Sequence, residues 1–121
     1  MSKAKILIVD DNHDAADALT RLVNKMGHDA RACYSGTEAI NAGDFGPDFI
    51  FMDIDLGDTS GYDVAKTISL DRRFSKTKLV ALTGYSQEED KQRAYQAGFH
   101  YHLSKPVGSA DLDKILKSAT I

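Results

Sequence analysis

The sequence predicts an α/β fold: a single doubly wound domain in which five parallel strands alternate with five helices. Short apolar runs recur along the chain, and stretches with helical periodicity separate them. This alternation predicts a parallel sheet whose crossover helices cover both faces. The expected strands are residues 6–9, 30–33, 49–52, 79–82 and 101–103.

The first, second and fourth helices are predicted from periodicity and from their terminal residues. Apolar side chains from Ala15 to Met26 recur at helical spacing, and Gly27 follows them as a left-handed stop. Ser35 and Ser86 each begin a Ser-x-x-Glu sequence, which is typical of the capping box at a helix start. We therefore expect helices after both serines.

Two further helices complete the alternation. The third is short and is expected over residues 62–69, and the last begins near Ser109 with its apolar side chains on one face. The apolar runs at 49–52 and 79–82 are almost unbroken, as in strands that helices cover on both faces. These two strands should therefore be central.

Length and composition indicate one folded domain spanning residues 1–121. Hydrophobic residues make up 42% of the chain and charged residues 27%, which is ordinary for a globular protein. The net charge of -3 provides no basic face, so we expect no nucleic-acid binding by this chain alone. Cys33 is the only cysteine, and the apolar stretch near the N-terminus is too short for a signal peptide or a membrane span. We expect a cytoplasmic protein without membrane association.

Polar residues follow four of the predicted strands. Asp10 and Asp11 come after the first strand, Asp53 after the third, Thr83 after the fourth and Lys105 after the fifth. In a doubly wound sheet the ligand crevice lies beyond the carboxyl ends of the strands. The five side chains should therefore meet in one crevice.

Their chemistry suggests phosphoryl transfer assisted by a metal ion. Three carboxylates held together repel one another, so a site that keeps them ionised needs a cation, and Mg²⁺ suits hard oxygen ligands beside a phosphate. A carboxylate can attack phosphorus to form an acyl phosphate, and Asp53, at the end of a central strand, is the candidate. The Lys105 ammonium and the Thr83 hydroxyl could hold phosphoryl oxygens.

Four segments resemble, in order and spacing, the motifs of response-regulator receiver domains of two-component signalling. They are ILIVDDN at 6–12, FMDIDL at 51–56 continuing to Gly61, ALTG at 81–84 and LSKP at 103–106. The resemblance covers essentially the whole chain. It implies a flavodoxin-like (βα)5 fold with strand order 2-1-3-4-5.

The resemblance also implies a role for each matched residue. Asp53 would be the phosphoacceptor, and Thr83 and Lys105 would complete the catalytic set. The implied Mg²⁺ ligands are Asp10 acting through water, Asp11, Asp53 and the backbone carbonyl of Asp55. The Lys105–Pro106 bond would be cis.

The family further implies a signalling switch rather than a turnover enzyme. A histidine kinase or a histidine phosphotransfer protein would supply the phosphoryl group, and the altered surface of the fourth helix and fifth strand would bind a downstream protein target. In the family a threonine and an aromatic residue move together. Here Thr83 is present, but His102 stands where Tyr or Phe is usual, so the readout of the switch differs from the family pattern.

Two other functions stay open at this point. The Asp-x-Asp sequence of Asp53 and Asp55 resembles the signature of haloacid-dehalogenase-like phosphohydrolases, in which the second acid serves as general acid/base. That family places its nucleophile on the first strand, whereas Asp53 lies mid-chain. The other alternative is a receiver-like binding module that works without phosphorylation. Within the receiver interpretation, a stand-alone regulator and a receiver from a hybrid kinase or multidomain protein are both compatible with the sequence.

Overall fold

The computed structural model describes residues 3–57, 59–84 and 88–118. Its strands form one parallel sheet in the order β2-β1-β3-β4-β5. The strands are β1 (Lys5–Val9), β2 (Asp29–Cys33), β3 (Phe49–Asp53), β4 (Lys78–Thr83) and β5 (Tyr101–Ser104). The predicted fold class and strand order are therefore confirmed, and β3 lies at the centre of the sheet.

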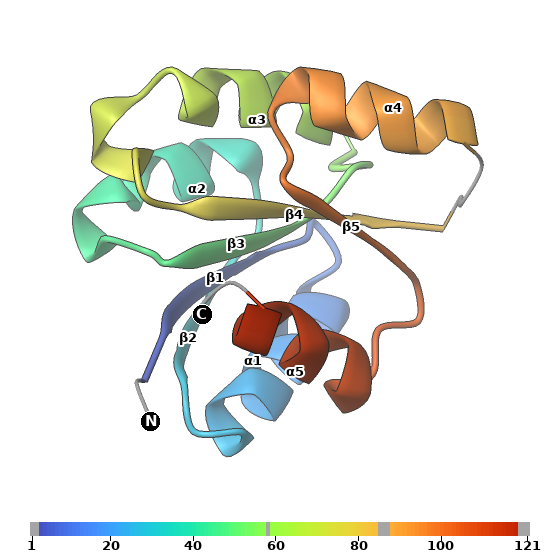
Figure 1. Cartoon of the computed structure of the whole chain (residues 1–121). Coiled ribbons are helices and arrows are strands. Elements are labelled where there is room, and N and C mark those ends of the chain that lie inside the picture. The colour runs from blue at the N-terminus through green and yellow to red at the C-terminus, as the bar shows by residue number, and fades with distance from the viewer. Residues whose placement is uncertain (1–2, 58, 85–87, 119–121) are drawn as a thin grey trace.

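Helices cover both faces of this sheet. The α-helices are α1 (His13–Lys25), α2 (Gly36–Asn41), α3 (Gly61–Ser69), α4 (Glu88–Ala97) and α5 (Ser109–Ser118), and two short 3-10 helices are η1 (Gly43–Phe45) and η2 (Arg72–Phe74). Helices α1 and α5 lie on one face, and α2, α3 and α4 lie on the other (Figure 1). In the described part of the chain, none of the helices has the length and apolar content that crossing a bilayer requires.

The helix ends follow from the local sequence. The Asn12 side chain accepts a backbone N–H from the first turn of α1 at 3.1 Å. Gly27 follows the end of that helix with a φ of 101°, a conformation that glycine adopts at little cost. Ser35 Oγ accepts the N–H of Glu38 at 3.1 Å, as the predicted cap of α2 requires. The cap predicted at Ser86 lies outside the described residues.

Each face of the sheet has its own hydrophobic core, because side chains alternate along every strand. Leu7 and Ile50 pack on the side of α2, α3 and α4, and Ile8 and Phe51 pack on the side of α1 and α5. Burying each such side chain contributes about 1.5–3 kcal/mol. The two cores therefore hold β1, β3 and β4 firmly, and these strands fix the positions of the residues at their carboxyl ends.

Candidate functional site

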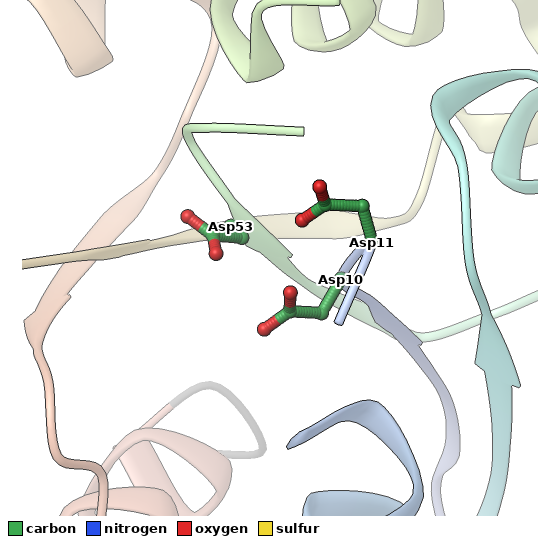
Figure 2. A group of neighbouring side chains, drawn as sticks. All are labelled: Asp10, Asp11 and Asp53. Atoms are coloured by element: carbon green, nitrogen blue, oxygen red, sulfur yellow. The ribbon is translucent and has the colours of Figure 1, made fainter. Parts of the chain in front are cut away.

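The acidic residues predicted from the strand ends lie together at the carboxyl edge of the sheet. Asp10 and Asp11 follow β1, and Asp53 is the last residue of β3. One carboxylate oxygen from each lies within 4.8 Å of the other two. Figure 2 shows that the three side chains extend from the ends of the two strands into the same region. Because β1 and β3 are parallel neighbours, the sheet itself sets this spacing.

Lys105 reaches the acidic cluster from the loop between β5 and α5. Its Nζ donates to Asp53 Oδ2 at 2.5 Å and lies 3.6 Å from Asp10 Oδ2. The backbone N–H of Lys105 donates to the Thr83 carbonyl at 2.8 Å, which ties this loop to the end of β4. The Lys105–Pro106 bond is cis, as the resemblance implies.

Burial and charge act together on the ionisable groups of the cluster. Burial raises the pKa of the Asp10 carboxyl, and the N–H of Asn12, donated at 3.0 Å, lowers it. The nearby Asp53 and Asp11 carboxylates raise this pKa, and the Lys105 ammonium lowers it; the net shift is upward. Burial by itself lowers the pKa of Lys105, but the carboxylates of Asp53 and Asp10 outweigh it, so the pKa of Lys105 is raised. The raised pKa of Asp10 is thus due first to burial, whereas that of Lys105 is due to the neighbouring carboxylates.

The cluster fits a hard divalent cation. Its donors are carboxylate oxygens alone, without a histidine or cysteine among the described residues of the group. Mg²⁺ binds oxygen ligands at about 2.0–2.1 Å in octahedral geometry, so two oxygens on one ion lie at most about 4.2 Å apart. Small side-chain shifts, or a water between Asp10 and the ion, would bring the three carboxylates into this range. The backbone N–H of Asp55 donates to Asp53 Oδ1 at 3.0 Å, so the Asp55 peptide also lies at the edge of the cluster.

The loop after β3 passes unusually close to the acidic residues. At Gly57, φ is 81°, and a Cβ atom would lie 2.8 Å from Asp11 Oδ2. At Gly61, a Cβ atom would lie 2.6 Å from the Asp53 carbonyl oxygen. Glycine at both positions lets the backbone of the loop lie against the site, which a larger residue would prevent.

Thr83 and His102 occupy neighbouring strands on the α4 side of the cluster. Thr83 is buried at the end of β4 and borders a cavity of about 220 Å³ together with Asp53. Tyr101 and Leu103 pack toward α1 and α5, so the alternation of β5 directs His102 to the opposite face, which α4 covers. The Nε2 atom of His102 is buried and has no hydrogen-bond partner among the described residues.

Arg93, on α4, is a residue of this region that the sequence patterns did not indicate. Its guanidinium carbon lies 4.4 Å from the centre of the Tyr62 ring, and it borders the same cavity as Asp53 and Thr83. The sequence offers no signal for it, because its position depends on how α4 packs beside α3. Spacing from a strand end, which located the other residues, does not apply to a residue in the middle of a helix.

The chain is similar to receiver proteins over most of its length. The family model described as response regulator receiver domain matches residues 6–117. The polar-differentiation response regulator DivK of Brucella ovis is 30% identical over 114 residues, which cover 93% of each chain. Hybrid signal transduction histidine kinase L of Dictyostelium discoideum is 31% identical over 121 residues, which cover 93% of this chain and 7% of that protein. The chain therefore corresponds to a small part of the hybrid kinase and to nearly all of DivK.

A solved structure agrees with these sequence matches. The CheY-like response regulator receiver domain from Methylobacillus flagellatus is 32% identical, with a TM-score of 0.85 over 98% of this chain and 99% of that one. The strand order was predicted from the family resemblance, and the acidic edge of the sheet from the residues that follow the predicted strands. The chain belongs to the response-regulator receiver domain family of two-component signalling.

Proposed function

We propose that Asp53 accepts a phosphoryl group from a histidine kinase or a histidine phosphotransfer protein, and that this changes the surface of α4 and β5 for a downstream protein target. One observation carries the proposal: Lys105 Nζ lies 2.5 Å from Asp53 Oδ2, and carboxylate oxygens of Asp10, Asp11 and Asp53 lie within 4.8 Å of one another. A nucleophile, a cation and a metal-binding group therefore share one edge of the sheet.

In the transfer, an Asp53 oxygen forms a bond to phosphorus while the phosphorus–nitrogen bond of the donor's phosphohistidine breaks. The histidine nitrogen keeps the bonding electron pair and takes up a proton. Lys105 would exchange its contact with Asp53 Oδ2 for the new phosphoryl oxygens, and the Thr83 hydroxyl would donate to another of them. These two side chains would orient the phosphoryl group without forming a covalent bond to it.

Receiver domains bind Mg²⁺ at an acidic pocket, and the acidic cluster supports the same role here. The residues that would hold the ion are Asp10 through water, Asp11, Asp53 and the backbone carbonyl of Asp55. A bound Mg²⁺ neutralises charge on the phosphoryl oxygens. Without it, the carboxylates would repel an approaching phosphate.

The proposed switch couples Asp53 to the α4 and β5 surface through Thr83 and His102. Phosphorylation adds about 1.5–2 negative charges, and it shifts a conformational equilibrium only as far as the two conformers differ in how well they hold that charge. Thr83 borders the cavity beside Asp53, and His102 lies on the adjacent strand toward α4. Movement of the threonine toward the phosphoryl group would free space for the histidine ring.

Labelling with a small phosphodonor tests the proposal. With Mg²⁺ and acetyl phosphate, we expect one acid-stable and base-labile phosphoryl group per chain, detected by intact-protein mass spectrometry. Asp53→Asn should carry none, and a chelator should abolish labelling of the parent. Asp44→Asn is the matched control, because Asp44 is exposed and lies in η1, away from the cluster.

The outcomes separate the alternatives. Continuous hydrolysis of phosphate esters would favour a phosphohydrolase of the haloacid-dehalogenase type, in which Asp55 acts as general acid/base. A folded parent protein that takes up no label would favour a binding module that works without phosphorylation. Stoichiometric labelling that depends on Asp53 supports the switch.

A further inference from the structure

We infer that Arg93 is a further positioning residue for phosphoryl transfer: from α4, its guanidinium binds the phosphoryl oxygens that enter the cavity beside Asp53 and Thr83. The inference rests on the proposed function of Asp53 and adds a residue that the family motifs in this sequence do not include. Arg93 would bind phosphoryl oxygens twice: first those of the incoming acyl phosphate, and then those of the phosphoryl group on Asp53.

The first observation is which residues border the cavity beside Asp53. It measures about 220 Å³, and Asp53, Thr83 and Gly84 border it together with Asp55, Tyr62 and Arg93. The proposed nucleophile thus borders the same cavity as a threonine and an arginine. Lys105 does not border this cavity; its ammonium contacts the acidic cluster from the β5–α5 loop. The two cations therefore approach Asp53 from different elements.

The second observation is how Arg93 is held. Its guanidinium carbon lies 4.4 Å from the centre of the Tyr62 ring, and Tyr62 is itself buried in an edge-to-face contact with Phe99. A cation–π contact attracts the guanidinium to the face of the ring and needs no conventional hydrogen-bond acceptor. No described residue forms an ion pair or hydrogen bond with Arg93. The aromatic contact therefore positions the cation without using its donors.

The third step is electrostatic. An anionic donor that enters this cavity meets Asp53 and Asp55, with Asp10 and Asp11 nearby. The Lys105 ammonium is already in contact with two of these carboxylates. A guanidinium binds phosphate oxygens through paired N–H groups, whereas an ammonium acts as a point charge. Arg93 would thus reduce the repulsion between the anionic donor and these carboxylates in the cavity that Lys105 does not border.

The test compares Arg93→Gln with the parent protein in Mg²⁺. We expect the acetyl phosphate concentration for half-maximal labelling rate to rise about tenfold, as for the loss of one charge-assisted hydrogen bond. Binding of fluoroberyllate, which occupies the place of the phosphoryl group on the aspartate, should weaken to a similar extent. Both differences should shrink at high ionic strength, because Arg93 is exposed and its charge is screened.

Three variants serve as controls. Arg93→Lys should lie between the parent and Arg93→Gln, because it keeps the charge and loses the paired donors. Arg21→Gln removes an exposed arginine from α1 and should behave as the parent does. Tyr62→Phe keeps the ring under the guanidinium and should retain most of the effect of Arg93. Circular dichroism establishes that each variant is folded.

Failure of the inference can be told apart from failure of the proposed function. If the parent is labelled on Asp53 and folded Arg93→Gln shows the parent's donor dependence and fluoroberyllate affinity, the inference is overturned, and Arg93 serves only to cover Tyr62. A loss of thermal stability without a change in either anion measurement overturns it equally. If the parent itself takes up no label, the proposed role of Asp53 is contradicted, independently of the results with the Arg93 variants.

Discussion

The contacts of Lys105 show how one side chain can be held in place and still be available for a new partner. The Lys105 side chain is 37% exposed, and that of Asp53 is 13% exposed. Water reaches the ammonium and partly screens its attraction to the Asp53 carboxylate. The ammonium can therefore change from the Asp53 carboxylate to a phosphoryl oxygen at low cost. The same contact places it beside the carboxylate of the proposed phosphoacceptor.

His102 gives a prediction that concerns a single atom. Its Nε2 is buried without a hydrogen-bond partner among the described residues, and such a group costs about 1–3 kcal/mol. Phenylalanine has a ring that occupies the same position and carries no polar atom. We expect His102→Phe to raise the free energy of unfolding by about 1 kcal/mol, measured by urea denaturation.

His28 provides the contrast for this measurement. Its Nδ1 accepts the backbone N–H of Ala4 at 3.1 Å, so His28→Phe should lower the free energy of unfolding instead. Equal or lower stability of His102→Phe relative to the parent would show that the Nε2 atom carries no such cost.

The residue scale also shows what the sequence could reveal about the site. Asp10, Asp11, Asp53 and Lys105 were found because each follows a predicted strand, and parallel strands end at the same edge. Arg93 was not found, because its place depends on packing between helices. A position on a strand end can be read from local sequence, whereas a contact between two helices depends on the whole fold.

At the scale of elements, the turn from β3 into α3 is the most tightly constrained part of the site. Gly61 donates its N–H to the Ile54 carbonyl at 2.6 Å, and it begins α3 directly behind the end of β3. The N-cap of that helix is Ser60, whose Oγ accepts the N–H of Tyr62 at 3.2 Å. The position of Asp53 thus depends on how closely α3 approaches the strand.

Gly61→Ala tests this constraint. The added Cβ would lie 2.6 Å from the Asp53 carbonyl oxygen and 2.8 Å from Ile54 Cα, and backbone atoms have little room to move away. We expect the free energy of unfolding to fall by about 1–3 kcal/mol, as in overpacked cores. Affinity for Mg²⁺, measured by isothermal titration calorimetry, should also fall, because relief of the clash displaces Asp53.

Gly108→Ala is the matched control, since its Cβ would meet only Asp111 Oδ2 at an ordinary contact distance of 3.8 Å. A Gly61→Ala protein with the parent's stability and Mg²⁺ affinity would contradict the proposed role of the close approach.

Element boundaries were predicted well where periodicity or a cap marked them. All five expected strands agree with those observed to within one residue, and the end of α1 before Gly27 is correct. The 3-10 helices Gly43–Phe45 and Arg72–Phe74 were not predicted. Each is a single turn, too short for apolar periodicity to appear.

At the scale of the whole molecule, the two cores make the sheet a fixed platform, and the proposed switch lies at its edge and at α4. Helix α4 carries Arg93 at the cavity beside Asp53, and it also covers the face of β5 toward which His102 points. The proposed phosphorylation site and the proposed partner surface thus meet at one helix. A change at Asp53 has a short physical path to the outer surface of the domain.

The acidic cluster gives a prediction about the stability of the entire domain. Burial raises the pKa of Asp10, the N–H of Asn12 lowers it, Asp53 raises it, Lys105 lowers it and Asp11 raises it, and the net shift is upward, so the ionised form of Asp10 is unfavourable in the fold. Asparagine is neutral and can still accept the N–H of Asn12. In a chelator at neutral pH, we therefore expect Asp10→Asn to have a higher Tm than the parent.

The order of the two Tm values should reverse when Mg²⁺ is present. At a Mg²⁺ concentration about 100 times Kd, the parent should gain about 2.7 kcal/mol, and Asp10→Asn should gain less because it holds the ion more weakly. The advantage of the variant in chelator should fade as the pH falls, since protonation of Asp10 makes the parent equally neutral at that position. Asp44→Asn should follow the parent in both conditions. Two results would contradict the view that a bound cation relieves repulsion among these carboxylates. One is a parent Tm that does not change with Mg²⁺, and the other is an Asp10→Asn variant with a lower Tm than the parent in chelator.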